Sequence, residues 1–249
     1  ELYPAGCVAT AAVQIMNYYR WPERGTGTVE HRGETLDLST HVYDWGNMKD
    51  SYSYYMDADG NYIPLDFTEQ QGTAVATLMR DFGYAIGMQY AAEGSSAYHH
   101  AIVETLFENF GYAPTVRHHL RRLYTKDTWE QLIREELSAG RPIAYSGRGA
   151  TGGHSFVCDG IDADGLLHIN WGWNGSYDGY FDMDILQPEG EGAGHDAEGY
   201  VIDAAMVTGI RPATEGDATR METGLTADVT CFTDGSRLKV DGNVYNFTK

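Results

Sequence analysis

The spacing of apolar residues divides the chain into a helical first half and a strand-rich second half. From Cys7 to Arg20, apolar positions recur every three or four residues, the spacing of a helix with one buried face. The same spacing predicts three more helices, at Glu69–Phe82, Tyr98–Phe110 and Trp129–Leu137. Pro22 is expected to stop the first helix, and Gly83 and Gly140 fit C-terminal caps.

Beyond Pro142 the pattern changes to short apolar runs separated by turns rich in Gly and Asp. These runs predict strands at Ile143–Tyr145, Ser155–Asp159, Leu166–Asn170, Tyr180–Met183 and Tyr200–Val207. Helices first and an antiparallel sheet second indicate an α+β fold, with a helical N-terminal half packed on a β-sheet C-terminal half. We expect one domain over residues 1–212. Residues 213–249 are expected to be a linker with a C-terminal extension, or the start of a further β domain.

Two segments resemble fragments of calcium-binding loops. They begin at Asp57 and Asp162, but the twelfth position of each is Thr68 or Trp173 instead of the bidentate Glu that such loops require. Hairpin turns are the better interpretation. The adjacent pairs His99-His100 and His118-His119 cannot face one metal from a regular helix, and we expect them on the solvated surface.

Charge and cysteine content exclude several classes of protein. The 249 residues include 36 acidic and 17 basic side chains, a net charge of −19, which disfavours nucleic acids and anionic membranes as partners. No apolar run reaches the roughly 18 residues that a membrane span needs. Three widely spaced cysteines without a CxxC motif argue against a disulfide framework and against a zinc site. We expect neither a metal nor a cofactor.

Cys7 is the first candidate for chemistry because it opens a predicted helix. The helix dipole favours an anion there, and thiolate catalysis needs a lowered cysteine pKa. The small residues Ala5 and Gly6 would let a substrate backbone approach. The chain begins only six residues earlier, which is expected for a processed chain whose secretion signal or pro-segment has been removed.

His154 is the candidate base. It follows the flexible pair Gly152-Gly153 and opens a predicted strand, 147 residues after Cys7 (154 − 7). That separation lies within the roughly 130–150 residues between the cysteine and histidine of papain-like enzymes. Asn170, on the next strand, could accept from one imidazole nitrogen, and the indole of Trp171 could shield the pair from water.

Other interpretations remain open. Trp171-Gly172-Trp173 and the tyrosines at positions 52, 54 and 55 also suit a non-catalytic module that binds glycans or a host surface. A Cys–His pair could also serve an amidase or a transglutaminase that uses another acyl acceptor.

Several segments resemble, in the same order, those of the streptopain family of bacterial secreted cysteine proteases. They are Gly6–Met16 followed by Trp21-Pro22, Leu106–Tyr112, Glu136–Ser138, Gly152–Gly160 and His168–Trp173. The similarity covers about residues 4 to 212. It implies a papain-like fold, an N-terminal pro-domain that inhibits the precursor and is absent from this chain, and secretion or attachment at the bacterial cell surface. It also implies protein or peptide substrates, hydrolysed through a thioester acyl-enzyme.

The resemblance also assigns roles to residues. Cys7 would be the nucleophile, His154 the general acid/base, and Asn170 and Trp171 the supports of the imidazole. Ser95 and Ser96 would flank a cleft that prefers an apolar substrate side chain, and Ser146, Gly147, Gly152 and Gly153 would line it near the histidine. Family members often carry Gln where this chain has Ser146, so we expect backbone donors to stabilise the oxyanion: the Cys7 N–H and one from residues 147–149.

Overall fold

The structure is a computed structural model that describes residues 3–150, 152–188, 199–217, 228–231 and 238–241. Its helices are α1 (Cys7–Tyr19), α2 (Glu69–Ala85), α3 (Ala101–Phe110) and α4 (Lys126–Ser138), with short 3₁₀ turns at Leu38–Thr40 and Arg121–Leu123. The predicted order of helices followed by an antiparallel sheet is confirmed.

The C-terminal half is built on one antiparallel sheet with the strand order β5-β10-β6-β7-β8-β9. Its strands are β5 (Arg117–Leu120), β6 (Ile143–Arg148), β7 (Gly153–Ile161), β8 (Leu167–Asn170), β9 (Gly179–Phe181) and β10 (Ile202–Thr208). Among the described residues, three small two-stranded sheets lie outside it: β1 (Thr28–His31) with β2 (Glu34–Asp37), β3 (Tyr54–Met56) with β4 (Tyr62–Pro64), and β11 (Asp228–Cys231) with β12 (Leu238–Asp241). Asp234-Gly235 in the C-terminal extension is typical of a hairpin turn and lies outside the described residues.

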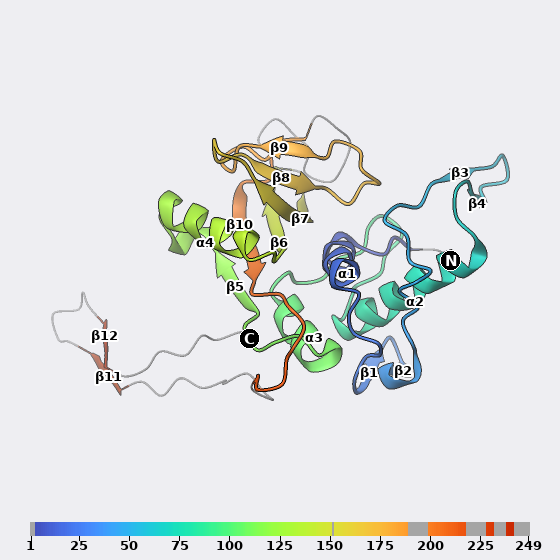
Figure 1. Ribbon diagram of the computed structural model, residues 1–249, viewed down its shortest axis with the longest axis horizontal. Coiled ribbons are helices and arrows are strands. Elements are labelled where there is room, and N and C mark those ends of the chain that lie inside the picture. The colour runs from blue at the N-terminus through green and yellow to red at the C-terminus, as the bar shows by residue number, and fades with distance from the viewer. Residues whose placement is uncertain (1–2, 151, 189–198, 218–227, 232–237, 242–249) are drawn as a thin grey trace.

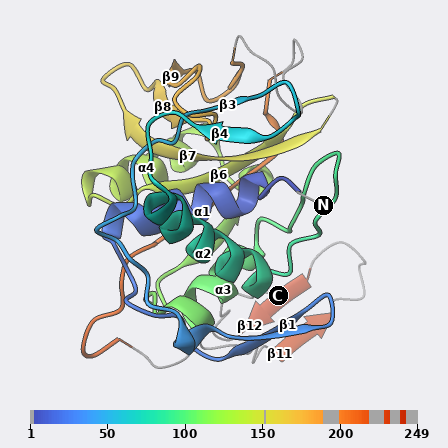
Figure 2. The same ribbon diagram turned by 90° about the vertical axis from the view of Figure 1, so that its right-hand side faces the viewer.

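Helix α1 lies at the interface between the helical half and the sheet, which we call the seam (Figure 1). It packs against α2 on one side and against β7 and β6 on the other (Figure 2). Its small buried residues Ala9, Ala11 and Ala12 let both halves approach closely. Two apolar cores result, one around α1, α2 and α3 and one between α4 and the sheet.

Glycine at position 6 allows α1 to start at Cys7. Gly6 has φ +89°, a backbone conformation that other residues adopt at a cost. A Cβ there would lie 2.7 Å from the sulfur of Met88, so the side-chain-free residue also lets residue 88 pack under the start of the helix. The local sequence therefore fixes where the thiol sits.

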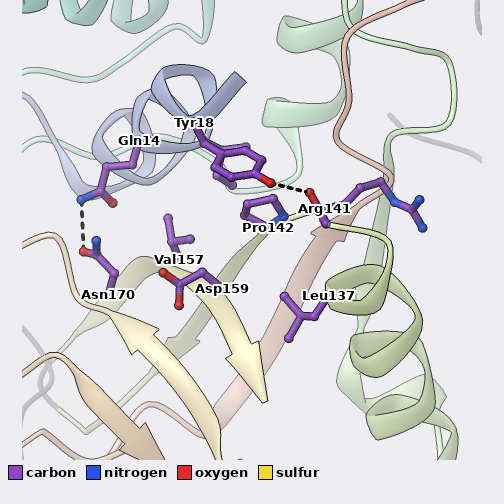
Figure 3. Close-up of a pocket in the computed structure, with 10 residues that line it drawn as sticks. Gln14, Tyr18, Leu137, Arg141, Pro142, Val157, Asp159 and Asn170 are labelled. Carbon is purple, nitrogen blue, oxygen red and sulfur yellow. Dashed lines mark hydrogen bonds between the residues drawn. The ribbon is translucent and has the colours of Figure 1, made fainter. Parts of the chain in front are cut away.

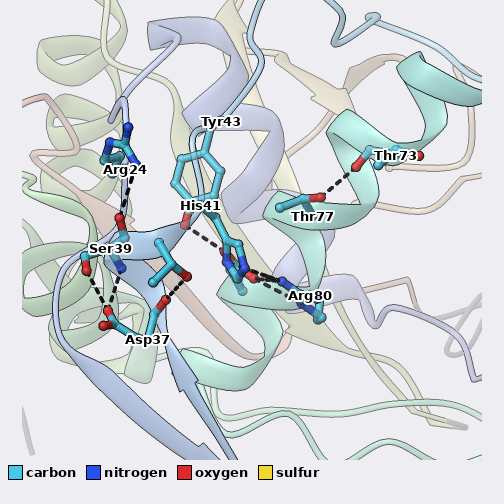
Figure 4. A network of polar contacts seen from close by, with 10 residues as sticks. Arg24, Asp37, Ser39, His41, Tyr43, Thr73, Thr77 and Arg80 are labelled. Atoms are coloured by element: carbon cyan, nitrogen blue, oxygen red, sulfur yellow. Dashed lines mark hydrogen bonds and ion pairs between the residues drawn. The ribbon is translucent and has the colours of Figure 1, made fainter.

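A buried carboxylate fastens the loop between the hairpins β1–β2 and β3–β4 to α2. Asp81 is fully buried; it accepts from Tyr43 Oη at 3.2 Å and from the Arg80 guanidinium at 2.9 Å. Its other contact is with His41 Nδ1 at 2.8 Å (Figure 4). Because the charge is surrounded by donors, it ties residues 41–43 to the helix and supports the helical half that carries α1.

Three expectations about local structure need correction. Gly83 does not cap α2 but lies inside it, where a Cβ would stand 2.0 Å from the Tyr90 hydroxyl oxygen. His118 and His119 lie not on the open surface but half-buried in β5, an edge strand without apolar alternation. His99 has both ring nitrogens buried. The hairpin turns at Asp57 and Asp162 are confirmed, each carboxylate accepting backbone N–H groups of its own turn.

Candidate active site

Cys7 lies at the first turn of α1, and its sulfur is directed at the sheet. The backbone groups of Ser155 on β7, of Val8 and of Cys7 itself lie near the thiol and favour its charged form, which lowers its pKa. Ser155 is the neighbour of His154, so the structure brings the two sequence-predicted reactive residues onto adjacent elements, α1 and β7. The helix and the strand come from the two different halves of the chain.

His154 is held in a cage of aromatic rings. Its ring stacks on Trp173, with centroids 5.0 Å apart and planes at 24°, and it lies 6.3 Å from Trp171 at 19°. Phe156 and Tyr200 close two further sides at 5.8 and 5.4 Å. The cage excludes water from the ring faces and restricts rotation of the imidazole.

The hydrogen bond of the imidazole differs from the one we expected. His154 Nε2 lies 2.8 Å from the backbone carbonyl oxygen of Trp171, whereas the side-chain oxygen of Asn170 accepts from Gln14 Nε2 and from the N–H of Gly172. A carbonyl oxygen can only accept, so Nε2 must carry the hydrogen. Nδ1 then keeps its lone pair and is the nitrogen available as a base. The expected Asn170-to-imidazole bond is therefore wrong, although Asn170 lies next to the carbonyl that replaces it.

Burial dominates the electrostatics of both groups. Burial raises the pKa of the Cys7 thiol, and the three backbone groups only partly offset this effect. Burial lowers the pKa of His154, against the opposing effect of the Trp171 carbonyl. The lowered cysteine pKa expected from the helix dipole is thus outweighed by desolvation. Both shifts favour the uncharged thiol and imidazole at neutral pH, an arrangement in which proton transfer accompanies attack by the sulfur.

The backbone of the glycines before His154 is closely packed and hydrogen-bonded. Gly147 pairs with His154 across the ladder, and a Cβ on it would stand 1.9 Å from the carbonyl oxygen of Tyr200. The N–H of Gly149 donates to the carbonyl of Gly152, so it is not free for an oxyanion. Gly153 begins β7, and Ser146 pairs with Ser155. The other expected oxyanion donor is the Cys7 N–H. It lies at the start of α1 and therefore has no acceptor within the helix.

Residues 95 and 96 lie beside the start of α1. The carbonyl oxygen of Ser95 would be 3.2 Å from a Cβ on Gly6, and Ser96 is bridged to Gln89 by two backbone hydrogen bonds. A pocket of about 580 Å³ opens on the chain just before Cys7. Its lining is mostly aromatic: Tyr3, Pro4, Tyr54, Tyr62, Pro64, Phe67 and Ala92. The hairpin β3–β4 thus contributes two tyrosines to this pocket.

Two other features bear on the alternatives. Trp171 is fully buried, so its indole offers no face on which a sugar ring could stack. Among the described residues, no three His, Cys, Asp or Glu side chains are grouped to bind a metal ion. In the same part of the chain, every helix is too short or too polar to cross a bilayer.

Known proteins resemble this chain over most of its length. The model of the peptidase C10 family matches residues 1–181. The thiol protease/hemagglutinin PrtT of Porphyromonas gingivalis is 36% identical over 215 residues, and streptopain of Streptococcus pyogenes is 36% identical over 219. These matches cover 84% and 83% of this chain but 24% and 52% of the two relatives. The chain therefore spans a quarter to half of the length of these relatives.

Solved structures show the same fold. Active interpain A, a cysteine protease of Prevotella intermedia, superposes with a TM-score of 0.70 at 37% identity, covering 82% of each chain. A prointerpain A fragment from the same organism superposes with a TM-score of 0.68 at 36% identity, covering 84% of this chain and 64% of the fragment. The α+β fold of a papain-like cysteine protease, predicted from the sequence, is confirmed.

Proposed function

The chain belongs to the peptidase C10 family, and from this premise we propose that it is a secreted cysteine endopeptidase with Cys7 as nucleophile and His154 as base. The observation that carries the proposal is the hydrogen bond between His154 Nε2 and the Trp171 carbonyl, which leaves Nδ1 as the base nitrogen on the strand that packs against the start of α1. Binding alone would not require a base nitrogen to be set free beside a thiol.

The proposed reaction has two stages. Cys7 Sγ attacks the scissile carbonyl carbon while its proton passes to His154 Nδ1, and the backbone N–H of Cys7 stabilises the oxyanion. The C–N bond then breaks, and the amine leaves with the proton from His154. Water attacks the thioester in the second stage, again with His154 as base, and releases the acid and the thiol.

The substrate is proposed to be an extended polypeptide lying across the start of α1. Ser95 and Ser96 would flank its non-primed side, with Ser146, Gly147, Gly152 and Gly153 near the imidazole. The aromatic pocket before Cys7 suits an apolar side chain, since three tyrosines and a phenylalanine line it. The chain is also proposed to derive from a zymogen, because a precursor form of its structural relative, prointerpain A, has been described.

The test is digestion of a diverse peptide mixture by the reduced protein, with and without a thiol-directed epoxide, followed by mass spectrometry. We expect internal peptide bonds to be cleaved, and cleavage to stop with the epoxide or with Cys7→Ala. Cleavage at the parent rate by Cys7→Ala would refute the proposal. Transamidated products in place of hydrolysed ones would instead identify a transferase.

A further inference from the structure

The carbonyl that orients His154 belongs to a peptide unit held at both ends. Trp171 C=O accepts from His154 Nε2 at 2.8 Å, and the N–H of the same planar peptide unit, that of Gly172, donates to Asn170 Oδ1 at 2.9 Å. The Trp171 N–H is fixed separately, by Asp178 Oδ1 at 2.9 Å. The position of the Asn170 side chain therefore sets the direction of the carbonyl that faces the imidazole.

Gln14 of α1 fixes that side chain from across the seam. Its Nε2 donates to Asn170 Oδ1 at 3.1 Å, a bond between residues 156 positions apart in the chain (Figure 3). Gln14 follows Cys7 by seven residues, two helical turns, and so lies on the same face of α1. Between them, the methyl group of Thr10 lies where a Cβ on Gly172 would meet it at 3.2 Å.

We propose that Gln14 is a positioning residue for His154. The helix that carries the nucleophile would also set the base, through Gln14, the Asn170 amide and the Gly172 peptide unit. Helix α1 would then position both Cys7 and His154. The relative position of the sulfur and the imidazole would be kept when the two halves move. The inference rests on the proposed function only for its effect on turnover.

Packing does not explain the choice of an amide at position 14. Gln14 Oε1 is buried and, within the described residues, has no hydrogen-bond partner. Burying an unpaired oxygen costs stability, whereas a methionine of similar length would fill the same space without that cost. The Nε2 bond to Asn170 is what the amide supplies. The side chain also borders a pocket of about 290 Å³ that leads away along α1.

The test replaces Gln14 by Met and compares it with Asn17→Leu. Asn17 lies on the same helix, and its side-chain amide donates to the exposed carboxylate of Asp50 instead of to the site. Gln14→Met is expected to lower kcat by about 10- to 100-fold through misplacement of the base, with KM little changed. Asn17→Leu is expected to match the parent.

A second measurement does not depend on turnover. The Trp171 carbonyl raises the pKa of His154, so a loosened carbonyl must lower it. We expect the pKa of His154, followed by NMR of its ring nitrogens, to fall in Gln14→Met and to stay at the parent value in Asn17→Leu. If the parent cleaves no peptide, the proposed function fails while this titration still tests the link.

A double-mutant cycle separates positioning from general damage. Adding Gln14→Met to Asn170→Leu should cost no further activity, because the link is already broken. Multiplicative losses, or a His154 pKa unchanged by Gln14→Met, would overturn the proposal. A parent-like kcat in Gln14→Met would overturn it as well.

Discussion

The helical half and the sheet half hold their reactive side chains in different ways. Cys7 is placed by backbone: a helix start after Gly6, with backbone groups of Ser155 and Val8 near its sulfur. His154 is placed by side chains, four aromatic rings and a carbonyl that is itself anchored from α1. Changes around the thiol should therefore abolish activity, whereas changes around the imidazole should lower it by degrees.

The largest effect is expected from comparing Cys7 with Cys158. Cys7→Ala should lower kcat/KM by about 10⁴-fold or more, because the nucleophile is lost. Cys158 is completely buried in the sheet core, and Cys158→Ala should keep activity while lowering the free energy of unfolding by about 1 kcal/mol. Peptide cleavage and urea denaturation check both variants. Equal activity of the two variants would contradict the role of Cys7 as nucleophile.

A smaller, graded loss is expected in the aromatic cage. Trp173 is part-exposed and stacks directly on His154, so Trp173→Ala should lower kcat by about 10- to 100-fold with little loss of stability. Trp171→Ala instead leaves a cavity in the core and should lower the free energy of unfolding by about 3–5 kcal/mol. Steady-state kinetics and thermal denaturation distinguish these outcomes. An unchanged kcat in Trp173→Ala would show that the cage does not orient the base.

The parts of this account that could be read from the sequence are the local ones. Apolar spacing predicted α1 with Cys7 at its start, and the Gly pair before a strand predicted the place of His154. Strand β5 was missed, because Arg117–Leu120 has no apolar alternation and pairs only through its distant partner β10. Nothing local could reveal that Asn170 is bound by Gln14, since those residues are 156 positions apart. Gly83 resembled a cap because close packing against Tyr90 leaves the same signal as a turn.

A pair of glycines in the loop after β8 tests the contact between the halves. Gly172 and Gly175 both have positive φ, +77° and +81°, so alanine strains the backbone equally at each. Only the Cβ of Gly172→Ala would meet Thr10, at 3.2 Å, whereas nothing lies within 4 Å at Gly175. Each variant should lose about 1–2 kcal/mol from backbone strain. Only Gly172→Ala should also lose activity, as measured by kcat/KM at a temperature where both are folded.

The smallest effect is expected from the histidines where the two halves meet. Burial lowers the pKa of His99, before α3, to about 3 and that of His118, in β5, to about 4, and their rings lie 5.6 Å apart. Their ordinary pKa is 6.5, so the unfolded chain binds more protons below that pH. Their contribution to stability is present above pH 6.5 and is lost as the pH falls toward 4.

The free energy of unfolding should therefore fall by about 1 kcal/mol less across that pH range in His118→Gln than in the parent, because glutamine cannot be protonated. Denaturation curves recorded at several pH values measure this difference. His168→Gln is the matched control, because the ring of His168 on β8 is one-third exposed and paired with Asp159 on β7, away from β5. An identical pH slope in His118→Gln and the parent would contradict the role of this contact.

The most direct test of the Cys7–His154 pair is the rate at which Cys7 is alkylated by iodoacetamide at pH 6, in a Cys231→Ser background. Burial raises the pKa of Cys7, so alone this thiol should react more slowly than a free cysteine. We expect rapid labelling confined to Cys7, and its loss in His154→Ala with the fold intact. Labelling of His154→Ala at the parent rate, or equal labelling of Cys158, would contradict it.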